Sequence, residues 1–308
     1  MSSVTATGTE MRSYYGRPIL KEPTWTWEIP TYFFTGGLAG ASSVLSTAAR
    51  LAGNEKLART SLYLGAVADI VSPALLISDL GRPERFHHML RVVKVTSPMN
   101  VGSWVLLASG GASNVAAALE LLGRLKPLKL LAEAAATLTG APLATYTGVL
   151  IADTAVPVWH EGRRELPWLF GASAAASAGA AASVFLRPQD AGPARRLAVA
   201  GVLAEGALMQ LMELRLGKIG EVYRQGAAGR FSWAAKGLAI AGATLLARRG
   251  KQSRAALAVG GALVCAGELC LRWAVFNAGK QSARDPAYVV EPQRRRVTQR
   301  LQESRTGT

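Results

Sequence analysis

The sequence has few of the residues that hold metal clusters. Its 308 residues include two cysteines, Cys265 and Cys270, both in the last apolar segment. Iron–sulfur clusters are usually held by four cysteine thiolates, so we expect this chain to carry no cluster of its own. The spacing of the two cysteines suits neither a pair of metal ligands nor a disulfide within one helix. We interpret both as small core residues and expect no metal site.

Histidine is also scarce, and its positions bear on haem. The three histidines are His87, His88 and His160, and all of them fall in predicted links between apolar segments. Membrane cytochromes hold haem through histidines on their spanning helices. We therefore expect no haem within this chain, so that any electrons would come from another subunit.

Charged residues make up only 18% of the sequence, whereas 50% of the residues are hydrophobic. A soluble domain has about 25% charged residues, spread along its helices. Here the charges cluster between long stretches of Ala, Leu, Gly, Val and Ser. This pattern predicts a polytopic helical membrane protein, and a soluble helical repeat is the alternative.

The net charge of +15 raises the question of nucleic-acid binding. Basic residues that bind nucleic acid usually line one face or one arm of a protein. In this sequence they flank the apolar segments, as expected for side chains that anchor helices to anionic lipid. We therefore expect lipid contacts and no nucleic-acid partner. Residues 1–28 contain no apolar run, so we expect no cleavable signal peptide there.

Eight apolar segments have about the length that a membrane-spanning helix needs. They lie at 29–51, 58–80, 99–122, 130–152, 166–187, 195–216, 233–248 and 255–277, and 233–248 is the shortest. The predicted fold class is thus an all-α integral membrane protein with eight transmembrane helices in two four-helix bundles. Residues 1–28 form an extramembrane N-terminal segment, and residues 278–308 form a polar, basic tail. Residues 83–95 mix apolar and basic side chains and predict a short interfacial helix between spans two and three.

Eight crossings would place both termini on one side of the membrane, which we call the terminal side. The links on the opposite side are short and densely basic, for instance 124–129 and 248–254. Positive charge in short links marks the cytoplasmic side. The terminal side is therefore expected to be extracytoplasmic.

Ionisable groups inside a span are costly, and by default they indicate a functional site. Asp69 lies in the middle of the second span, and Asp79 lies at its end, directly before Leu-Gly-Arg-Pro-Glu-Arg-Phe. Asp69 is either neutral and hydrogen-bonded or a proton carrier, and we favour the functional reading. Asp79 and Arg82 are more simply interpreted as a structural ion pair. A series of polar steps toward Asp69 from the opposite side would consist of Asn114 and Glu133.

The direction of the helices brings further polar groups to the terminal side. Glu28 begins the first span, and Tyr146 lies one or two turns from the end of the fourth. Arg82 and Ser97 belong to the link between spans two and three. Structural alternatives exist: Glu28 as an acid favoured at a helix N-terminus, and Tyr146 as part of an interfacial aromatic belt. The belt would also include Trp25, Trp27 and Trp159.

Later spans carry acids as well. Glu205 and Glu213 lie in the sixth span. Glu268 and Arg272 lie one turn apart in the eighth span, and we expect them to pair within their own helix. We interpret that pair as structural.

Several motifs together resemble the NrfD/polysulfide-reductase membrane-subunit (PsrC-like) family, over nearly the whole chain. The element Asp79-Leu-Gly-Arg-Pro-Glu-Arg-Phe86, directly after a span, is the most specific. The weaker elements fall in the expected order: Tyr15-Gly-Arg-Pro18, Trp25-Thr-Trp-Glu-Ile-Pro-Thr-Tyr-Phe-Phe-Thr-Gly-Gly37, Ser97-Pro-Met99, Tyr146-Thr-Gly148 and Asp285-Pro-Ala-Tyr-Val-Val-Glu-Pro-Gln293.

The resemblance implies a haem-free quinone-binding subunit of a respiratory oxidoreductase complex in the plasma (inner) membrane of a prokaryote. Its substrate would be menaquinone or ubiquinone. It would exchange electrons with a ferredoxin-like [4Fe–4S] subunit, and through it with a molybdopterin-type catalytic subunit or a multihaem cytochrome. Coupling to proton movement would be possible in such a complex.

The resemblance also assigns roles to residues. Glu28 and Tyr146 would lie at the quinone oxygens, with Asp69 as a further catalytic residue. Asp79, Arg82 and Ser97 would line or support the pocket. The family commonly has Asn and His near the start of span one, where this chain has Glu28 and Thr31, so the quinone contacts are expected to differ. Two other functions remain open: a secondary transporter or proton channel, and a non-catalytic membrane anchor.

Overall fold

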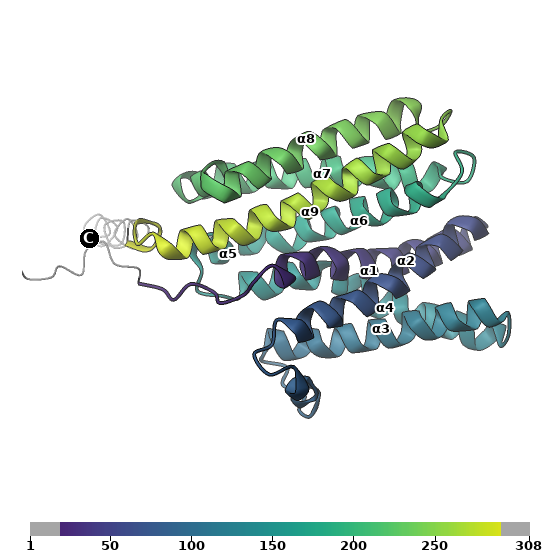
Figure 1. Ribbon diagram of the computed structural model, residues 1–308, viewed down its shortest axis with the longest axis horizontal. Helices are drawn as coiled ribbons and strands as arrows, with labels where there is room; N and C mark the ends of the chain where they lie inside the picture. Colours follow the sequence, from purple (N-terminus) through teal and green to yellow (C-terminus); the bar gives the residue numbers. More distant parts are fainter. Residues whose placement is uncertain (1–18, 291–308) are drawn as a thin grey trace, which may run out of the picture.

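The computed structural model describes residues 19–290, and this part of the chain is all-helical (Figure 1). Helices of 20 residues or more form its body: α1 (Glu28–Leu51), α2 (Glu55–Ser78), α3 (Pro98–Leu122), α4 (Lys126–Ala152), α6 (Leu166–Phe185), α7 (Gly192–Leu216), α8 (Gly226–Arg249) and α9 (Arg254–Arg284). Shorter helical segments connect them: η1 (Pro83–Leu90), α5 (Pro157–Glu161), η2 (Gly162–Arg164) and η3 (Gly217–Arg224). The predicted all-α class is confirmed for this part of the chain.

Six of these helical segments are long and apolar enough to cross a membrane. They are α2, α3, α4, α6, the continuous stretch of α7 with η3, and α9. The chain is therefore a multi-pass membrane protein. Helix α1 is rich in Ser, Thr and Gly, and α8 carries Arg230 and Lys236, which lowers the mean hydropathy of both.

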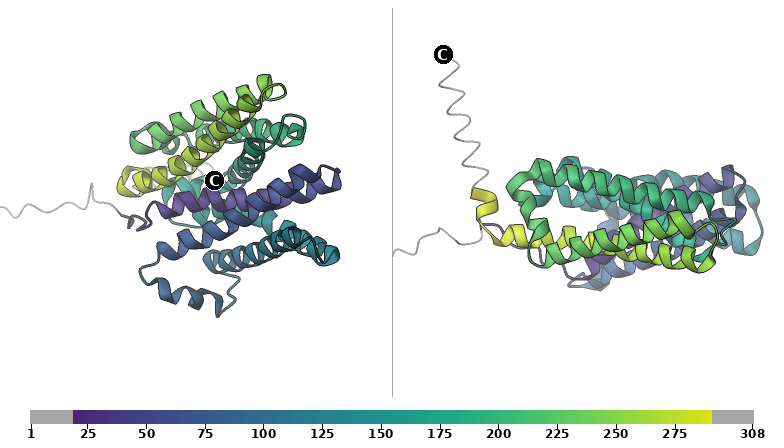
Figure 2. Two further views of the ribbon diagram at one scale, coloured as in Figure 1. Left: turned by 45° about the vertical axis from the view of Figure 1, so that its right-hand side comes forward. Right: turned by 90° about the horizontal axis from the view of Figure 1, so that it is seen from above.

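The long helices run roughly parallel or antiparallel to one another in every view (Figure 2). Helix α1 packs against α2 and α4, and α3 packs against α4 and α2. In the same way α6 packs against α7 and α9, and α8 against α9 and α7. Helix α1 also contacts α6 and α9, so it joins the two sets.

Close helix approach depends on small residues, as the crossing of α1 and α4 shows. A Cβ added to Gly140 would lie 2.8 Å from the carbonyl oxygen of Gly40, and one added to Gly40 would overlap the backbone of Gly140. Backbones at this distance leave no room for side chains, and packing of this kind drives helix association in membranes. Glycine is therefore required at both positions.

Local signals set several helix ends. The Asn54 side chain accepts a hydrogen bond from the Leu57 backbone at 3.1 Å and caps α2. Ser253 caps α9 in the same way, accepting from the Ala256 backbone at 3.2 Å. Helix α3 ends at Leu122, and the φ of 63° at the following Gly123 lies in the left-handed region that favours glycine.

Three boundaries show the largest differences from the sequence prediction. Helix α8 begins at Gly226 rather than near 233, because the short helix η3 takes up the first part of the expected link. Helix α9 continues past 277 to Arg284. The predicted interfacial helix over 83–95 is a 3₁₀ segment, and it ends at Leu90. The expectations for residues 1–18 and 291–308, including the Tyr15–Pro18 motif, lie outside the described residues.

Candidate functional site

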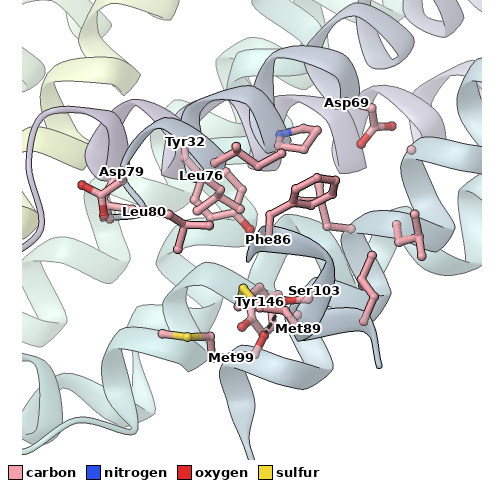
Figure 3. Close-up of a pocket in the computed structure, with 18 of the residues that line it drawn as sticks. Tyr32, Asp69, Leu76, Asp79, Leu80, Phe86, Met89, Met99, Ser103 and Tyr146 are labelled. Carbon is pink, nitrogen blue, oxygen red and sulfur yellow. Dashed lines mark hydrogen bonds between the residues drawn. The ribbon is translucent and has the colours of Figure 1, made fainter. Parts of the chain in front are cut away.

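A cavity of about 470 Å³ lies among α1, α2, η1, α3 and α4 (Figure 3). Most of its lining is aliphatic or aromatic. Figure 3 shows Asp69 and Asp79 at opposite ends of the cavity, with Phe86 between them. Concave, mostly apolar sites with a few polar groups are typical of small-molecule binding. The polar lining residues are Tyr32, Asp69, Asp79, Ser103, Asn114 and Tyr146.

The segment η1 forms one wall of the cavity and is held there by α3. Phe86 and Met89 of η1 line the cavity. The Asn100 side chain donates a hydrogen bond to the Met89 carbonyl at 2.8 Å and accepts one from the Lys94 backbone at 2.6 Å. Residues that were expected only to rest on the membrane surface therefore help to enclose the site.

Asp69 is the most deeply buried acid of the cavity, with 3% of its surface exposed. Its Oδ2 accepts a hydrogen bond from the Ser113 hydroxyl at 2.5 Å. Its Oδ1 has no hydrogen-bond partner among the residues that the structure describes. A buried carboxyl oxygen without a partner is costly. Asp69 thus combines a place in the cavity wall with a buried carboxyl oxygen that has no partner within residues 19–290.

Tyr146 of α4 lines the same cavity, and its hydroxyl donates to the Pro98 carbonyl at 2.6 Å. Its ring lies against Gly102 of α3, where an added Cβ would overlap the ring. Glycine at 102 is thus what allows Tyr146 to reach this position. The hydroxyl oxygen retains its capacity to accept a hydrogen bond.

Asp79 lies at one end of the cavity (Figure 3) and is tied to the segment that precedes α1. Its Oδ1 accepts hydrogen bonds from the Thr26 backbone at 3.2 Å and from the Thr26 hydroxyl at 2.9 Å. The same hydroxyl contacts the Glu28 carboxylate. Asp79 therefore interacts with Thr26, not with Arg82 as the sequence suggested.

The structure brings three of the six predicted site residues to the cavity. Asp69, Asp79 and Tyr146 line it. Glu28 is only indirectly connected, through Thr26. The other two residues, Arg82 and Ser97, lie outside its lining: Arg82 is exposed before η1, and Ser97 precedes α3.

Comparison with protein families matches residues 11–285 to the NrfD-type family described as Polysulfide reductase. The chain belongs to this family. A comparison with curated proteins gave no match. Members of the polysulfide reductase family are membrane subunits of oxidoreductases that interact with quinone, and they generally pair with an iron–sulfur electron-transfer subunit and a catalytic subunit.

Some residues that line the cavity of this polysulfide reductase family member were not predicted from the sequence. Tyr32 is 2% exposed and lies in the wall, but nothing in its sequence neighbourhood distinguishes it from a core aromatic. Gly102 and Ser103 gave no signal either. A signal was present for three residues of η1, Phe86, Met89 and Leu90. Apolar residues at this helical spacing mark one face that needs a partner. That face was assigned to lipid, whereas it covers the cavity.

The expected polar steps and aromatic belt are only partly present. Asn114 and Asp69 line the same cavity. Glu133 is instead bound by Arg50, with nitrogen–oxygen distances of 2.7 and 2.8 Å. Trp159 is fully buried and stacks on Trp25 at 6.0 Å between ring centroids, so it is not part of a lipid-facing belt.

The segment before α1 is also fixed to the end of α9. Glu22 accepts hydrogen bonds from Arg284 at 2.6 and 2.8 Å and lies 3.2 Å from Lys280. The hydrogen bonds from Arg284 hold the pKa of the Glu22 carboxyl below its ordinary value, with Lys280 acting in the same direction. This contact fixes the segment that carries Trp25, which lines the cavity, and Thr26, which binds Asp79.

Within residues 19–290, no group of three or more His, Cys, Asp or Glu side chains is arranged to hold a metal ion. Cys265 and Cys270 are both free thiols. The polar groups that line the cavity are carboxyl, hydroxyl and amide groups.

Proposed function

We propose that this chain is the quinone- or quinol-reactive membrane subunit of an oxidoreductase complex, and that the cavity is its quinone site. The apolar walls suit an aromatic ring with a hydrocarbon tail, and the polar groups suit the ring oxygens. The observation that carries the proposal is the unpartnered Oδ1 of Asp69 in an otherwise apolar cavity. Menaquinone and ubiquinone share this chemistry and are both candidates.

The proposed chemistry divides between the substrate and the chain. Interconversion of quinone and quinol moves two electrons and two protons, and the electrons would pass to or from the partner subunit. Asp69 would accept a proton from the substrate oxygen or donate one to it. A positioned acid or base of this kind contributes about 10²- to 10⁴-fold to a proton-transfer step. Ser113 would fix the orientation of the carboxyl group through its hydrogen bond at 2.5 Å.

The other predicted residues receive supporting roles in this proposal. Tyr146 would accept a hydrogen bond from a quinol hydroxyl, or donate to a quinone oxygen on release of Pro98. Asp79 would shape the mouth of the cavity, and Glu28 would position it through Thr26. Arg82 and Ser97, outside the lining, would support the link between α2 and α3.

We also propose that α1 and α8 cross the membrane, which makes eight spans in two four-helix bundles. Contacts of α1 with α2, α4, α6 and α9 shield its small polar residues from lipid. In α8, Lys236 lies 2.9 Å from Glu213, so its charge is paired. Both termini would then lie on one side, the extracytoplasmic side of the plasma (inner) membrane of a prokaryote, because the links at the opposite side are the basic ones.

The partner would be a ferredoxin-like [4Fe–4S] subunit, attached to a molybdopterin-type enzyme or a multihaem cytochrome. Its docking face would be the end of the molecule where α1 begins and α9 ends, next to the mouth of the cavity (Figure 1). Docking at this end would give a short path for electrons between a [4Fe–4S] cluster of the partner and a quinone in the cavity. Trp25 and Asp79 line the cavity at this end.

The test is quinol-dependent electron transfer in the assembled complex with Asp69→Asn and Tyr146→Phe. We expect Asp69→Asn to lower the turnover rate about 10²-fold, because the amide cannot take up a proton. Tyr146→Phe should lower it about 2- to 10-fold, the value of one hydrogen bond. Asp153→Asn is the matched control, since Asp153 is an exposed acid at the same end of the molecule and outside the cavity.

Assembly of each variant with the partner subunits is checked by co-purification. If both cavity variants assemble and turn over at the rate of the Asp153→Asn control, the cavity is not the quinone site. In that case the chain would serve as a membrane anchor.

A further inference from the structure

Two carboxyl groups and one guanidinium group meet in the interior of α6, α7 and α9, outside the cavity. Glu205 lies in the middle of α7, and Glu268 and Arg272 lie near the middle of α9. Their exposed fractions are 8%, 0% and 1%. The sequence did not connect Glu205 with Glu268, because only the packing of two distant helices brings them together.

The expected pairing of Glu268 with Arg272 along α9 is replaced by hydrogen bonds to α6. The Ser173 hydroxyl donates to Glu268 Oε2 at 2.6 Å, and Arg272 Nη2 donates to the Phe170 carbonyl at 3.0 Å. The guanidinium group also lies 3.8 Å above the Phe170 ring centroid. Both side chains are therefore oriented by α6, and neither satisfies the other.

Several atoms of this cluster remain without a partner. With both carboxyl groups ionised, Glu205 Oε2, Glu268 Oε1 and the Nε and Nη1 of Arg272 make no hydrogen bond within the described part of the chain. Glu205 and Glu268 nevertheless lie close enough to act on each other and to feel the charge of Arg272. The site is thus a set of charged groups with unused hydrogen-bonding capacity at mid-depth in the bundle.

The neighbouring helices bring no second cation to the cluster. Gly37 of α1 lies beside Arg272, and α8 presents Ala235 and Ala239 to Gly267. Within residues 19–290, the ionisable group outside the pair that acts on its two carboxyl groups is Arg272. The charge balance of the site therefore depends on the two carboxyl groups and one guanidinium group.

The cluster has one favourable protonation state. With both carboxyl groups ionised the cluster carries one negative charge, and with both protonated it carries one positive charge. An unbalanced charge in an apolar interior is strongly unfavourable. Arginine does not lose its proton in proteins, and two carboxylates that share a site do not both ionise readily. One proton on the carboxyl pair makes the cluster neutral.

We propose that Glu205 and Glu268 share a single proton and form a proton-binding site in the α6–α9 half of the molecule. The proton forms an O–H bond to one carboxyl oxygen, and the other carboxylate balances Arg272. A metal cation is disfavoured as the ligand by the charge of Arg272. This proposal does not depend on the ligand of the cavity.

Two aromatic rings separate this site from the cavity. Phe33 lines the cavity, and its ring centroid lies 5.9 Å from that of Phe170, on which Arg272 is stacked. The proton would thus be held close to the proposed quinone site but separated from it by two rings.

Glu213 provides a matched control in the same helix as Glu205. It is also buried, with 5% of its surface exposed, but Lys236 lies 2.9 Å from its Oε1 and Arg224 lies 3.2 Å from its Oε2. Two cations favour an ionised carboxylate. The Glu213 site and the Glu205–Glu268 site are therefore alike in burial. They differ in the number of neighbouring cations.

The test is infrared spectroscopy of the purified full chain at neutral pH, in the region of the protonated carboxyl C=O stretch. Isotope-labelled glutamate identifies a protonated glutamate in the unsubstituted protein, without any mutation. We expect one such band. It should disappear in Glu205→Gln and equally in Glu268→Gln, because removal of either carboxyl leaves the other ionised beside Arg272. It should persist in Glu213→Gln.

Thermal unfolding of the same variants gives a second readout. Each single glutamine variant remains neutral at the site, so the double variant should unfold at a clearly lower temperature than either, since it leaves Arg272 unbalanced. No glutamate band in the unsubstituted protein overturns the proposal. Two other results also overturn it: a different band lost in each single variant, or a double variant that is as stable as the single variants. Both results mean that the pair holds two protons rather than one.

Discussion

Asp69 and Asp79 line the same cavity but are held in different ways. Asp79 uses one oxygen to accept two hydrogen bonds from Thr26, which fixes the chain before α1. Asp69 accepts one hydrogen bond, from Ser113, and its second oxygen has no partner among residues 19–290. At the scale of single residues, this difference is the basis for proposing that Asp79 shapes the site and that Asp69 exchanges a proton with the ligand.

Gly102 and Gly111 offer a residue-scale test of how the cavity is built. Both lie on α3 and line the cavity, but a Cβ at 102 would overlap the Tyr146 ring, whereas one at 111 would meet nothing within 4 Å. We expect Gly102→Ala to destabilise the protein by about 1–3 kcal/mol through overpacking. Gly111→Ala should leave stability unchanged or raise it slightly, because alanine favours helix. Thermal unfolding in detergent compares the two, and equal melting temperatures would contradict the packing of Tyr146 on Gly102.

At the scale of elements, the cavity depends on how neighbouring helices are joined. The segment η1 is held against α3 by Asn100, and the start of α1 is held to the end of α2 by Thr26. At the other end of the molecule, Arg50 of α1 binds Glu133 of α4 and Glu55 of α2, each at 2.7 Å. These contacts set the spacing of α1, α2 and α4, which form much of the cavity wall.

The Arg50 contacts predict an asymmetry between two isosteric substitutions. Glu133→Gln removes a charge-assisted contact whose carboxyl is 4% exposed, and should cost about 1.5–3 kcal/mol. Glu55→Gln removes a partner that is 56% exposed and should cost about 1 kcal/mol or less. Urea or thermal unfolding of the two variants measures the difference. A Glu55→Gln variant as unstable as Glu133→Gln would show that burial does not set the strength of these pairs.

The helices were predictable from the sequence because each carries its own signal. Long apolar runs, the cap at Asn54 and the prolines and glycines at helix ends act within a few residues. The motif from Asp79 to Phe86 pointed to the family, and Asp69 stood out as an acid in the middle of a span. The boundaries of α8 and η3 did not follow, because polar helical residues there are stabilised by contacts such as that of Lys236 with Glu213.

The side-chain partners of the site were much less predictable. Asp79 was expected to pair with nearby Arg82, yet its partner Thr26 lies 53 residues away in the sequence. Glu268 likewise bonds Ser173 of another helix instead of Arg272 one turn away. Sequence spacing favours local pairs, whereas packing decides which groups meet, so the contacts across helices appear only in the structure.

At the scale of the whole molecule, two buried polar sites lie in different halves. The cavity belongs to α1–α4 with η1, and the carboxyl pair of Glu205 and Glu268 belongs to α7 and α9. Helix α1 contributes to both, through Phe33 at the cavity and Gly37 beside Arg272. The central claim is that the first of these sites binds quinone.

The most direct test of that claim is photolabelling with a quinone that carries a photoreactive group on its ring, in membranes that contain the assembled complex. Mass spectrometry then maps the attachment sites. We predict labels on η1 and the start of α3, at Phe86, Met89 or Met99, which line the cavity, and loss of these labels when unlabelled quinone is added in excess. Labels confined to exposed side chains outside the cavity, such as Trp168 or Trp233, and insensitive to competition would contradict the account.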